Sequence, residues 1–219
     1  MRIIKLAGGL GNQLHQYSFG CYLEKHGVEV RYNIDYFNKN LRPFSLKLFA
    51  CNMLFTDKKP TDLGDHGKYH YLKYADPVRG RLNKEMTLEK PFLFDNKNSL
   101  GIHVRRGDYI NHPRFVNLDM DYYHRAMKKI ESKRVYVFSD DLSWCKKNFP
   151  QEFVYVDYPD YICFDMLKRC TSKIIANSTF SWWAAYLGGG NIVAPLGWFH
   201  DPAKQERAIN QIPSAWQII

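Results

Sequence analysis

The second half of the chain alternates short apolar segments with helical segments, and this pattern constrains the fold most strongly. Each apolar segment is long enough for a strand and too short for a helix. Predicted strands cover 99–104, 135–138, 154–156, 174–176 and 192–194, and predicted helices cover about 119–131, Asp141 through Trp144, about 160–170 and 181–187. Strands joined through helices pair in parallel. The sequence therefore predicts an α/β fold with a Rossmann-like parallel sheet.

The N-terminal third carries the same pattern once. An apolar strand over 3–7 runs into a glycine-rich turn over 8–13, and a helix follows that ends at His26-Gly27. Apolar and polar residues then alternate from Val28 to Asp35, as in a strand with one buried face. This is a second, shorter βαβ unit.

The segment between about 38 and 98 is interrupted by proline and glycine, so we expect irregular structure with short helices there. The polar run over 95–98 is the best candidate for a boundary. We therefore predict an N-terminal domain over 1–97 and a C-terminal domain over 98–219.

The formal net charge is +9, which favours an anionic partner. The basic residues are scattered and form no recognised nucleic-acid motif, so nucleic acid is not expected as the partner. The five cysteines form no CxxC pair and are odd in number, which argues against a disulfide framework. No run approaches the ~20 apolar residues of a membrane span, and the first apolar run is too short for a signal peptide. We expect a cytoplasmic protein, with contact to an anionic membrane surface as a hypothesis.

Residues that could bind or react with a ligand are most concentrated at the end of the predicted strand over 99–104. It runs through His103 into Arg105, Arg106, Gly107 and Asp108. Ligands of open α/β sheets bind beyond the carboxyl ends of strands. A planar guanidinium group can donate two parallel hydrogen bonds to the oxygens of one phosphate. The alternative is a solvated turn with one surface ion pair, which is common and nearly neutral in energy.

Two further strand ends, and the glycine turn over 8–13, also hold polar groups. At Ser139-Asp140-Asp141 the carboxylates suit ribose hydroxyls or a metal, or one of them caps the next helix. At Asn177-Ser178-Thr179 hydroxyls begin a helix, where they cap it or bind phosphate together with free backbone amides. The glycine turn either approaches a ligand closely or is only a tight turn. No cluster has the spacing of a metal site.

Four segments in this order carry a resemblance: 8–14, 103–109, 138–141 and 175–183. Together they resemble the alpha-1,2-fucosyltransferase family. The resemblance implies transfer of L-fucose from GDP-β-L-fucose to a sugar hydroxyl, with inversion. It also implies two facing Rossmann-like domains of GT-B type, the N-terminal one reduced, and a reaction that needs neither metal nor cofactor.

The resemblance also assigns roles to individual residues. Arg105 would bind the β-phosphate and stabilise the departing GDP, while Asn12 would face the fucose and phosphate from the other domain. Asp35, at a strand end, is a candidate general base, with Asp108 as an alternative that instead orients Arg105. Gly11 is also expected to bind the donor. His103 and Asp165 would lie near the guanine and Asp140 or Asp141 on the nucleoside side, and Ser178, Thr179, Phe180 and Ser181 would contact the pyrophosphate.

The expected acceptor is a glycan or lipid-linked oligosaccharide, through the 2-hydroxyl of a terminal galactose. Two other functions stay open. One is a non-catalytic protein that binds a nucleotide or polyanion with the same loops. The other is a transferase of the same fold that uses another sugar nucleotide. The oligomeric state is not predicted.

Overall fold

The computed structural model describes residues 1–39, 42–61 and 70–219. They form two compact units, unit 1 (Met1–Pro91) and unit 2 (Phe92–Ile219). Each unit is described by itself. The predicted boundary between residues 97 and 98 falls in the segment that leads from Pro91 to the first strand of unit 2.

Unit 2 is built on a six-stranded sheet in which every pair of neighbours is parallel. The strands are β3 (Ser99–Val104), β4 (Arg134–Ser139), β5 (Val154–Val156), β6 (Ser172–Ile174), β7 (Asn191–Ala194) and β8 (Gln217–Ile218), in the order β5-β4-β3-β6-β7-β8. The predicted parallel α/β sheet is thus confirmed. β8 was not predicted, because two exposed residues carry no readable pattern.

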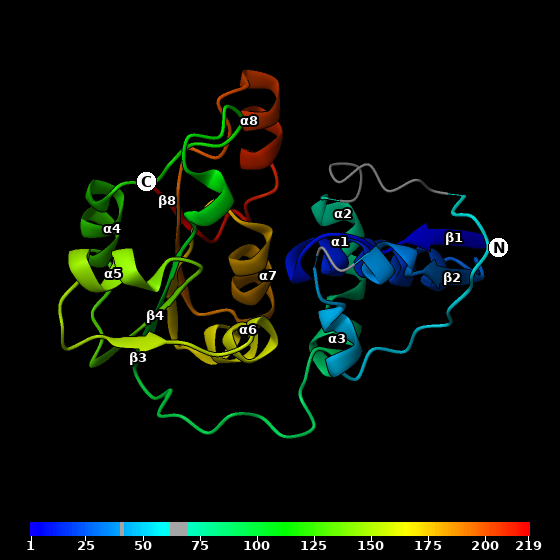
Figure 1. The fold of residues 1–219 in the computed structure, drawn as a ribbon, viewed down its shortest axis with the longest axis horizontal. Helices are drawn as coiled ribbons and strands as arrows, with labels where there is room; N and C mark the ends of the chain where they lie inside the picture. Colours follow the sequence, from blue (N-terminus) through cyan, green and yellow to red (C-terminus); the bar gives the residue numbers. More distant parts are fainter. Residues whose placement is uncertain (40–41, 62–69) are drawn as a thin grey trace. The chain divides into compact units, whose positions relative to one another are not determined.

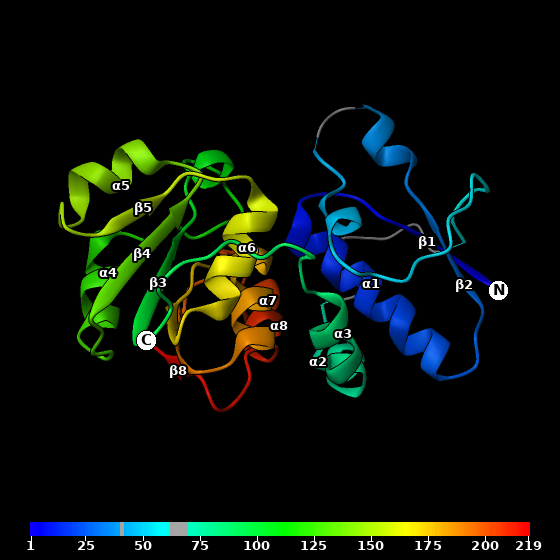
Figure 2. The same ribbon diagram turned by 90° about the horizontal axis from the view of Figure 1, so that it is seen from below.

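Helices cover both faces of this sheet (Figures 1 and 2). α4 (Met120–Met127) and α5 (Leu142–Asn148) lie on one face, and α6 (Asp160–Arg169) and α7 (Thr179–Gly188) pack together on the other. α8 (Pro202–Ile209) follows β7. β3 is buried at all of its positions, as the central strand of a covered sheet should be.

The chain reverses its direction across the sheet between β3 and β6. From β3 it proceeds through β4 to the β5 edge, and from β6 through β7 to the β8 edge. The crevice outside the carboxyl ends of two such strands is where open α/β sheets bind ligands. The fold therefore places the residues after β3 and β6 at the switch point.

β6 begins two residues before the predicted strand because Lys173, a polar residue in sequence terms, is fully buried. Its Nζ donates to the carbonyl oxygens of Cys170 at 2.6 Å and Gly189 at 2.8 Å. These two residues are the C-caps of α6 and α7. Burial lowers the pKa of Lys173 to about 8. One lysine thus satisfies carbonyl groups at the ends of two helices, where positive charge is also favoured.

Unit 1 contains one βαβ unit followed by short helices. β1 (Arg2–Lys5) and β2 (Val30–Asn33) pair in parallel on either side of α1 (Leu10–Lys25) in sequence, and Tyr32 forms a parallel bridge to Phe55. The short helices expected after residue 38 are present. They include η2 (Ser45–Leu48), α2 (Leu72–Ala75), η3 (Asp76–Val78) and α3 (Arg79–Glu85), and η1 (Asp35–Lys39) precedes them.

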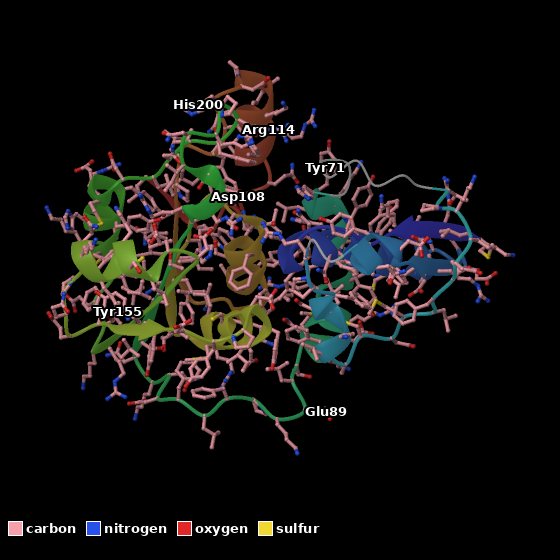
Figure 3. All side chains as sticks on the ribbon, in the orientation of Figure 1. Tyr71, Glu89, Asp108, Arg114, Tyr155 and His200 are labelled. Atoms are coloured by element: carbon pink, nitrogen blue, oxygen red, sulfur yellow. The ribbon has the colours of Figure 1, made fainter. Side chains whose placement is uncertain are left out.

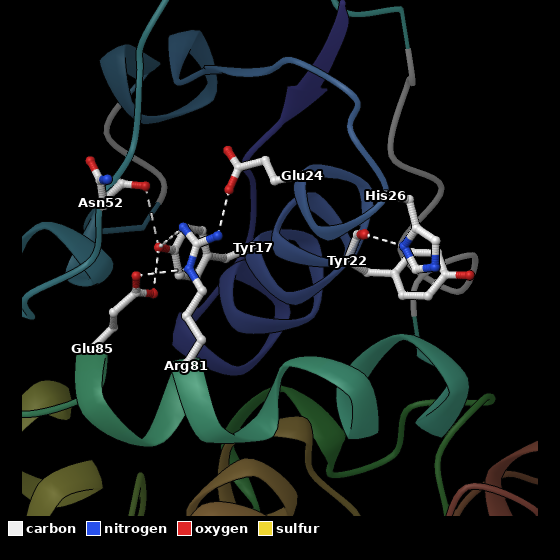
Figure 4. Close-up of polar contacts among 7 residues, drawn as sticks. All are labelled: Tyr17, Tyr22, Glu24, His26, Asn52, Arg81 and Glu85. Atoms are coloured by element: carbon white, nitrogen blue, oxygen red, sulfur yellow. Dashed lines mark hydrogen bonds and ion pairs between the residues drawn. The ribbon is translucent and has the colours of Figure 1, made fainter.

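A polar cluster ties α3 to α1 (Figure 4). The guanidinium of Arg81 lies 2.6 Å from Glu24 Oε2 and 2.8 Å from Glu85 Oε1. The hydroxyl of the buried Tyr17 donates to Glu85 Oε2 at 2.6 Å. Arg81 therefore joins carboxylates from both helices.

Three of the five cysteines, Cys21, Cys145 and Cys170, are buried, and all five are free thiols. Cys21, Cys145 and Cys163 lie within α1, α5 and α6. Across the described ranges, no helix combines the length and apolar character that a bilayer crossing requires.

Candidate functional site

Arg105 is held in one orientation directly after β3. Its Nη1 lies 2.9 Å from Asp140 Oδ2, and its Nη2 pairs with Asp108 Oδ1. The guanidinium also lies over the ring of Tyr109, 5.1 Å from its centroid. Its Nε is buried and has no hydrogen-bond partner among the described residues. Arg105 is thus a fixed cation whose Nε–H is left for a ligand.

Asp140 contacts the turn after β3, which contains Arg105 and Arg106, with both of its carboxylate oxygens. Oδ2 pairs with Arg105, and Oδ1 accepts from the backbone N–H of Arg106 at 2.9 Å. A Cβ on Gly107 would lie only 2.4 Å from that Oδ2, so a side chain there would displace the carboxylate. The sequence predicted Asp140 on the nucleoside side, and that role stays a prediction. Its observed contacts position Arg105.

Arg106 fastens the same turn to α5. Its Nε lies 3.2 Å from Asp141 Oδ2, and its guanidinium lies 4.0 Å from the ring centroid of Trp144. Asp141 Oδ1 accepts from the Trp144 backbone N–H at 3.0 Å, which confirms that one carboxylate of this pair caps the helix. Arg106 is engaged by the protein itself.

Asp108 lies in the short 3-10 helix η4 (Gly107–Tyr109), which follows β3 (Figure 3). It is more than half exposed, and its carboxylate pairs with Arg105. This contact favours the alternative in which Asp108 orients Arg105 over the one in which it acts as a base.

His103 is buried two residues before Arg105. Burial, and next the positive charge of Arg105, lower the pKa of His103 to about 3, so its imidazole is neutral at physiological pH. Its ring centroid lies 5.2 Å from that of Phe180, in the first turn of α7. Its Nδ1 has no hydrogen-bond partner within the described part of the chain. A second buried polar atom near Arg105 is therefore available to a ligand.

α7 begins without a side-chain cap. Ser178 is its N-cap residue but makes no capping hydrogen bond, whereas α4, α5 and α8 are each capped by an aspartate. The hydroxyl of the buried Ser181 donates to the carbonyl oxygens of Ala176 at 3.3 Å and Ser178 at 3.4 Å, inside the turn. Thr179 and Phe180 are partly exposed. Such an N-terminus offers backbone amides and the positive end of the helix dipole to an anion.

Asn177, just before this helix, fixes two neighbouring loops. Its Nδ2 donates to the carbonyl oxygens of Val116 at 2.8 Å and Trp198 at 3.1 Å. The backbone N–H of His200 donates to Arg114 at 3.0 Å, and Figure 3 labels both residues on these loops. Sequence reasoning treated Asn177 only as part of a helix start, since nothing in the sequence shows which loops it contacts.

Asp165 is buried on α6 and is paired within the protein. Arg169, one turn later, reaches its Oδ2 at 2.7 Å and also lies over the ring of Phe94 at 4.8 Å. The carboxylate therefore helps to hold the segment around Phe94 against α6. Contact between Asp165 and a guanine stays a prediction.

In unit 1, glutamine side chains of α1 stabilise the glycine-rich turn that follows β1. Gly8 adopts a left-handed φ of 80°, and Asn12 folds back so that a Cβ on Gly8 would lie 2.9 Å from its Nδ2. Gln16 accepts from the backbone N–H of Ala7 at 2.8 Å. Gly11 is buried in the first turn of α1. Contact of Asn12 or Gly11 with a donor substrate stays a prediction.

Asp35 is exposed at the first position of η1, directly after β2 and Ile34. Its Oδ2 accepts from Asn33 Nδ2 at 2.9 Å. The carboxylate is accessible at the carboxyl end of the strand, where the sequence placed it. Its role as a general base stays a prediction.

In the ranges that the structure covers, no group of three or more His, Cys, Asp and Glu side chains is arranged to hold a metal ion. The Arg105 guanidinium after β3 and the backbone amides that begin α7 are suited to an anion.

Comparison with known proteins identifies the family. The model of glycosyl transferase family 11 matches residues 68–216, which include the ends of β3, β4 and β6. The chain belongs to glycosyltransferase family 11. The resemblance to the alpha-1,2-fucosyltransferase family is thereby confirmed.

Three relatives illustrate this membership. The chain is 36% identical over 135 residues to the O-antigen biosynthesis glycosyltransferase WbnK of Escherichia coli, covering 54% of this chain and 45% of that one. It is 31% identical over 137 residues to an alpha-1,2-colitosyltransferase of Escherichia coli, covering 54% and 47%. It is 31% identical over 139 residues to human galactoside alpha-(1,2)-fucosyltransferase 1, covering 57% and 37%. The matched segment thus spans less than half the length of each of these relatives.

Proposed function

We propose that this family 11 glycosyltransferase transfers L-fucose from GDP-β-L-fucose to the 2-hydroxyl of a terminal galactose on a glycan or lipid-linked oligosaccharide, with inversion. The observation that carries the proposal is Arg105, a fixed cation at the sheet's switch point whose buried Nε has no hydrogen-bond partner in the described part of the chain. Similarity to human galactoside alpha-(1,2)-fucosyltransferase 1 supports fucose as the transferred sugar and this linkage to a galactoside.

The proposed diphosphate site joins Arg105 to the uncapped start of α7. Arg105 Nε donates to the β-phosphate, and the backbone amides after Ser178 donate to the other phosphate oxygens. The neutral His103 adds a hydrogen-bonding group from the same strand end without adding charge. The protein thus supplies positive charge at the position where a divalent metal neutralises diphosphates elsewhere, and the proposed reaction needs no metal.

In the reaction, the acceptor oxygen forms a bond to C1 of fucose while the bond between C1 and the β-phosphate oxygen breaks. GDP leaves with the bonding electron pair, so negative charge grows on the β-phosphate. Arg105 and the α7 amides are already oriented, and they stabilise this charge without reorganising. Attack opposite the leaving group gives the α-linked product, and the acceptor proton goes to a base, for which Asp35 is our candidate.

A second donor sugar has a specific observation in its favour. The chain is as similar to an alpha-1,2-colitosyltransferase as to the human fucosyltransferase, at 31% identity each. Transfer of colitose is therefore the alternative function. The two functions are distinguished by measuring transfer from the fucose nucleotide and from the colitose nucleotide, first with each donor alone and then with both together.

The test of the proposal is incubation with GDP-fucose and a β-galactoside, followed by detection of GDP and the fucosylated product. Arg105→Ala should lower the rate by ~10²–10³, the usual cost of removing a preoriented donor to a leaving group. Arg125→Ala is the matched control, because Arg125 is exposed on α4 and pairs with Asp121 one turn earlier in the same helix. A donor bound without GDP release supports a non-catalytic nucleotide-binding protein instead.

A further inference from the structure

The ring of Tyr109 adds a further constraint on the Arg105 guanidinium. The two carboxylates hold this group at Nη1, through Asp140, and at Nη2, through Asp108. A planar group held at two atoms can still tilt about the line that joins them, and Nε lies off that line. The guanidinium carbon lies 5.1 Å from the centroid of the Tyr109 ring, and contact with the ring opposes this tilt. The direction of the Nε–H therefore depends on Tyr109.

Tyr109 is itself held by a second ring. The rings of Tyr109 and Phe115 are stacked, with their centroids 4.0 Å apart and their planes 5° from parallel. Phe115 in turn contacts the ring of Phe199, with 5.5 Å between the centroids. Stacked rings attract one another, so each ring limits the movement of the next. The guanidinium thus lies at the end of a row of three aromatic side chains, which we call the Tyr109 stack (Tyr109, Phe115 and Phe199).

Backbone contacts join the Tyr109 stack to the start of α7. Phe115 and Phe199 form an antiparallel bridge. Asn177, which is buried directly before the N-cap residue of α7, donates to the carbonyl oxygens of Val116 at 2.8 Å and Trp198 at 3.1 Å. One amide thus fixes both segments of the stack to the chain that leads from β6 into α7. The stack therefore connects the arginine after β3 to the start of α7, which are the two parts of the proposed diphosphate site.

We propose that Tyr109 is a positioning residue, which through its place in the Tyr109 stack aims the Nε–H of Arg105 at the β-phosphate of the donor. The face of the ring produces this effect, and the hydroxyl group is not needed for it. This inference rests on the proposed function, because it takes the ligand of Arg105 to be the donor diphosphate. Removal of the ring should change the orientation of Arg105 while both carboxylates remain in place.

The first test measures the orientation of Arg105 without a ligand. In NMR spectra of the isotope-labelled full chain, the Nε–H signal of Arg105 is assigned by its loss in Arg105→Ala. The current of a nearby aromatic ring displaces such a signal, and a buried N–H that is held in place exchanges slowly with water. Tyr109→Leu should remove the displacement and speed the exchange. Tyr109→Phe keeps the ring and should preserve both.

The second test measures GDP affinity by titration calorimetry. A cation–π contact favours the aimed orientation by a factor of about 2 to 30, so Tyr109→Leu should weaken GDP binding about 2- to 30-fold, and Tyr109→Phe should restore most of this loss. In the Arg105→Ala background, Tyr109→Leu should cause no further loss, because its effect passes through Arg105. Tyr155→Leu is the matched control, since Tyr155 is a partly exposed tyrosine on the edge strand β5.

An Arg105 Nε–H signal that Tyr109→Leu leaves unaltered, or that exchanges too fast to detect in the wild-type chain, would overturn the proposal. Wild-type GDP affinity in Tyr109→Leu, or an equal loss with and without Arg105, would also overturn it. Failure of the wild-type chain to bind GDP would instead contradict the proposed function. The NMR comparison would then still decide whether Tyr109 orients Arg105.

Discussion

Replacing Gly107 with alanine tests how the turn after β3 holds Arg105. The new Cβ would lie 2.4 Å from Asp140 Oδ2, whereas ordinary contact begins at 3.4 Å, so the carboxylate must move by about 1 Å. That oxygen lies 2.9 Å from Arg105 Nη1, and the same carboxylate accepts from the Arg106 backbone. The substitution therefore acts on Arg105 through Asp140.

The expected loss follows from these contacts. A hydrogen bond to a charged group contributes about 1.5–3 kcal/mol, and partial exposure of both side chains reduces this to ~1–2 kcal/mol. A misplacement of about 1 Å in a catalytic site costs on the order of 10²-fold in rate. We expect kcat/KM of Gly107→Ala to fall about 10- to 100-fold, measured as GDP release, with only a small loss of thermal stability.

Two further variants make this test specific. Asp140→Ala removes the carboxylate that the new methyl group would meet, so Gly107→Ala/Asp140→Ala should be no slower than Asp140→Ala alone. Gly80→Ala is the control, because no atom of the described residues lies within 4 Å of a Cβ at that helical position. Activity of Gly107→Ala within twofold of the wild type, or additive effects in the double variant, would refute the reasoning.

The remaining predictions concern stability. Gly20→Ala should destabilise unit 1 by ~1–3 kcal/mol in urea unfolding, because its Cβ would lie 2.0 Å from the hydroxyl of the buried Tyr32; an unchanged midpoint would contradict this. The pKa of Lys173 is about 8 in the folded chain, so between about pH 8 and 10.5 the unfolded chain binds more protons than the folded chain. The free energy of unfolding should therefore rise with pH in this range by ~3 kcal/mol relative to that of Lys173→Met. For His103, whose folded pKa is about 3, stability is lost as pH falls from about 6.5 toward 3, and His103→Gln should flatten this part of the profile.

The layered sheet of unit 2 was readable from the sequence because its strands are apolar and its crossovers are helical. A cap of α5 by one carboxylate of the Asp140-Asp141 pair was also readable, since aspartate is a preferred N-cap residue, but the sequence did not show which of the two it is. α8 was not predicted, and none of its residues is buried. The start of β6 was misplaced because Lys173 is charged, and a charged residue usually indicates an exposed loop, whereas this lysine is buried.

The residues of the candidate site were readable, but their contacts were not. Arg105 meets Asp140 because β3 pairs with β4 in the register Val104 to Ser139, which places the next residues of both strands side by side. Register depends on packing across the whole sheet, so no local pattern reveals it. For the same reason the sequence could not show that Gly107 leaves room for the Asp140 carboxylate.

A crystal structure of the chain with GDP tests the central claim most directly. The account predicts the β-phosphate within hydrogen-bonding distance of Arg105 Nε, the other phosphate oxygens at the backbone amides that begin α7, and a loss of GDP affinity in Arg105→Ala but not in Arg125→Ala. A diphosphate bound elsewhere, with Arg105 still paired only to Asp108 and Asp140, would contradict it.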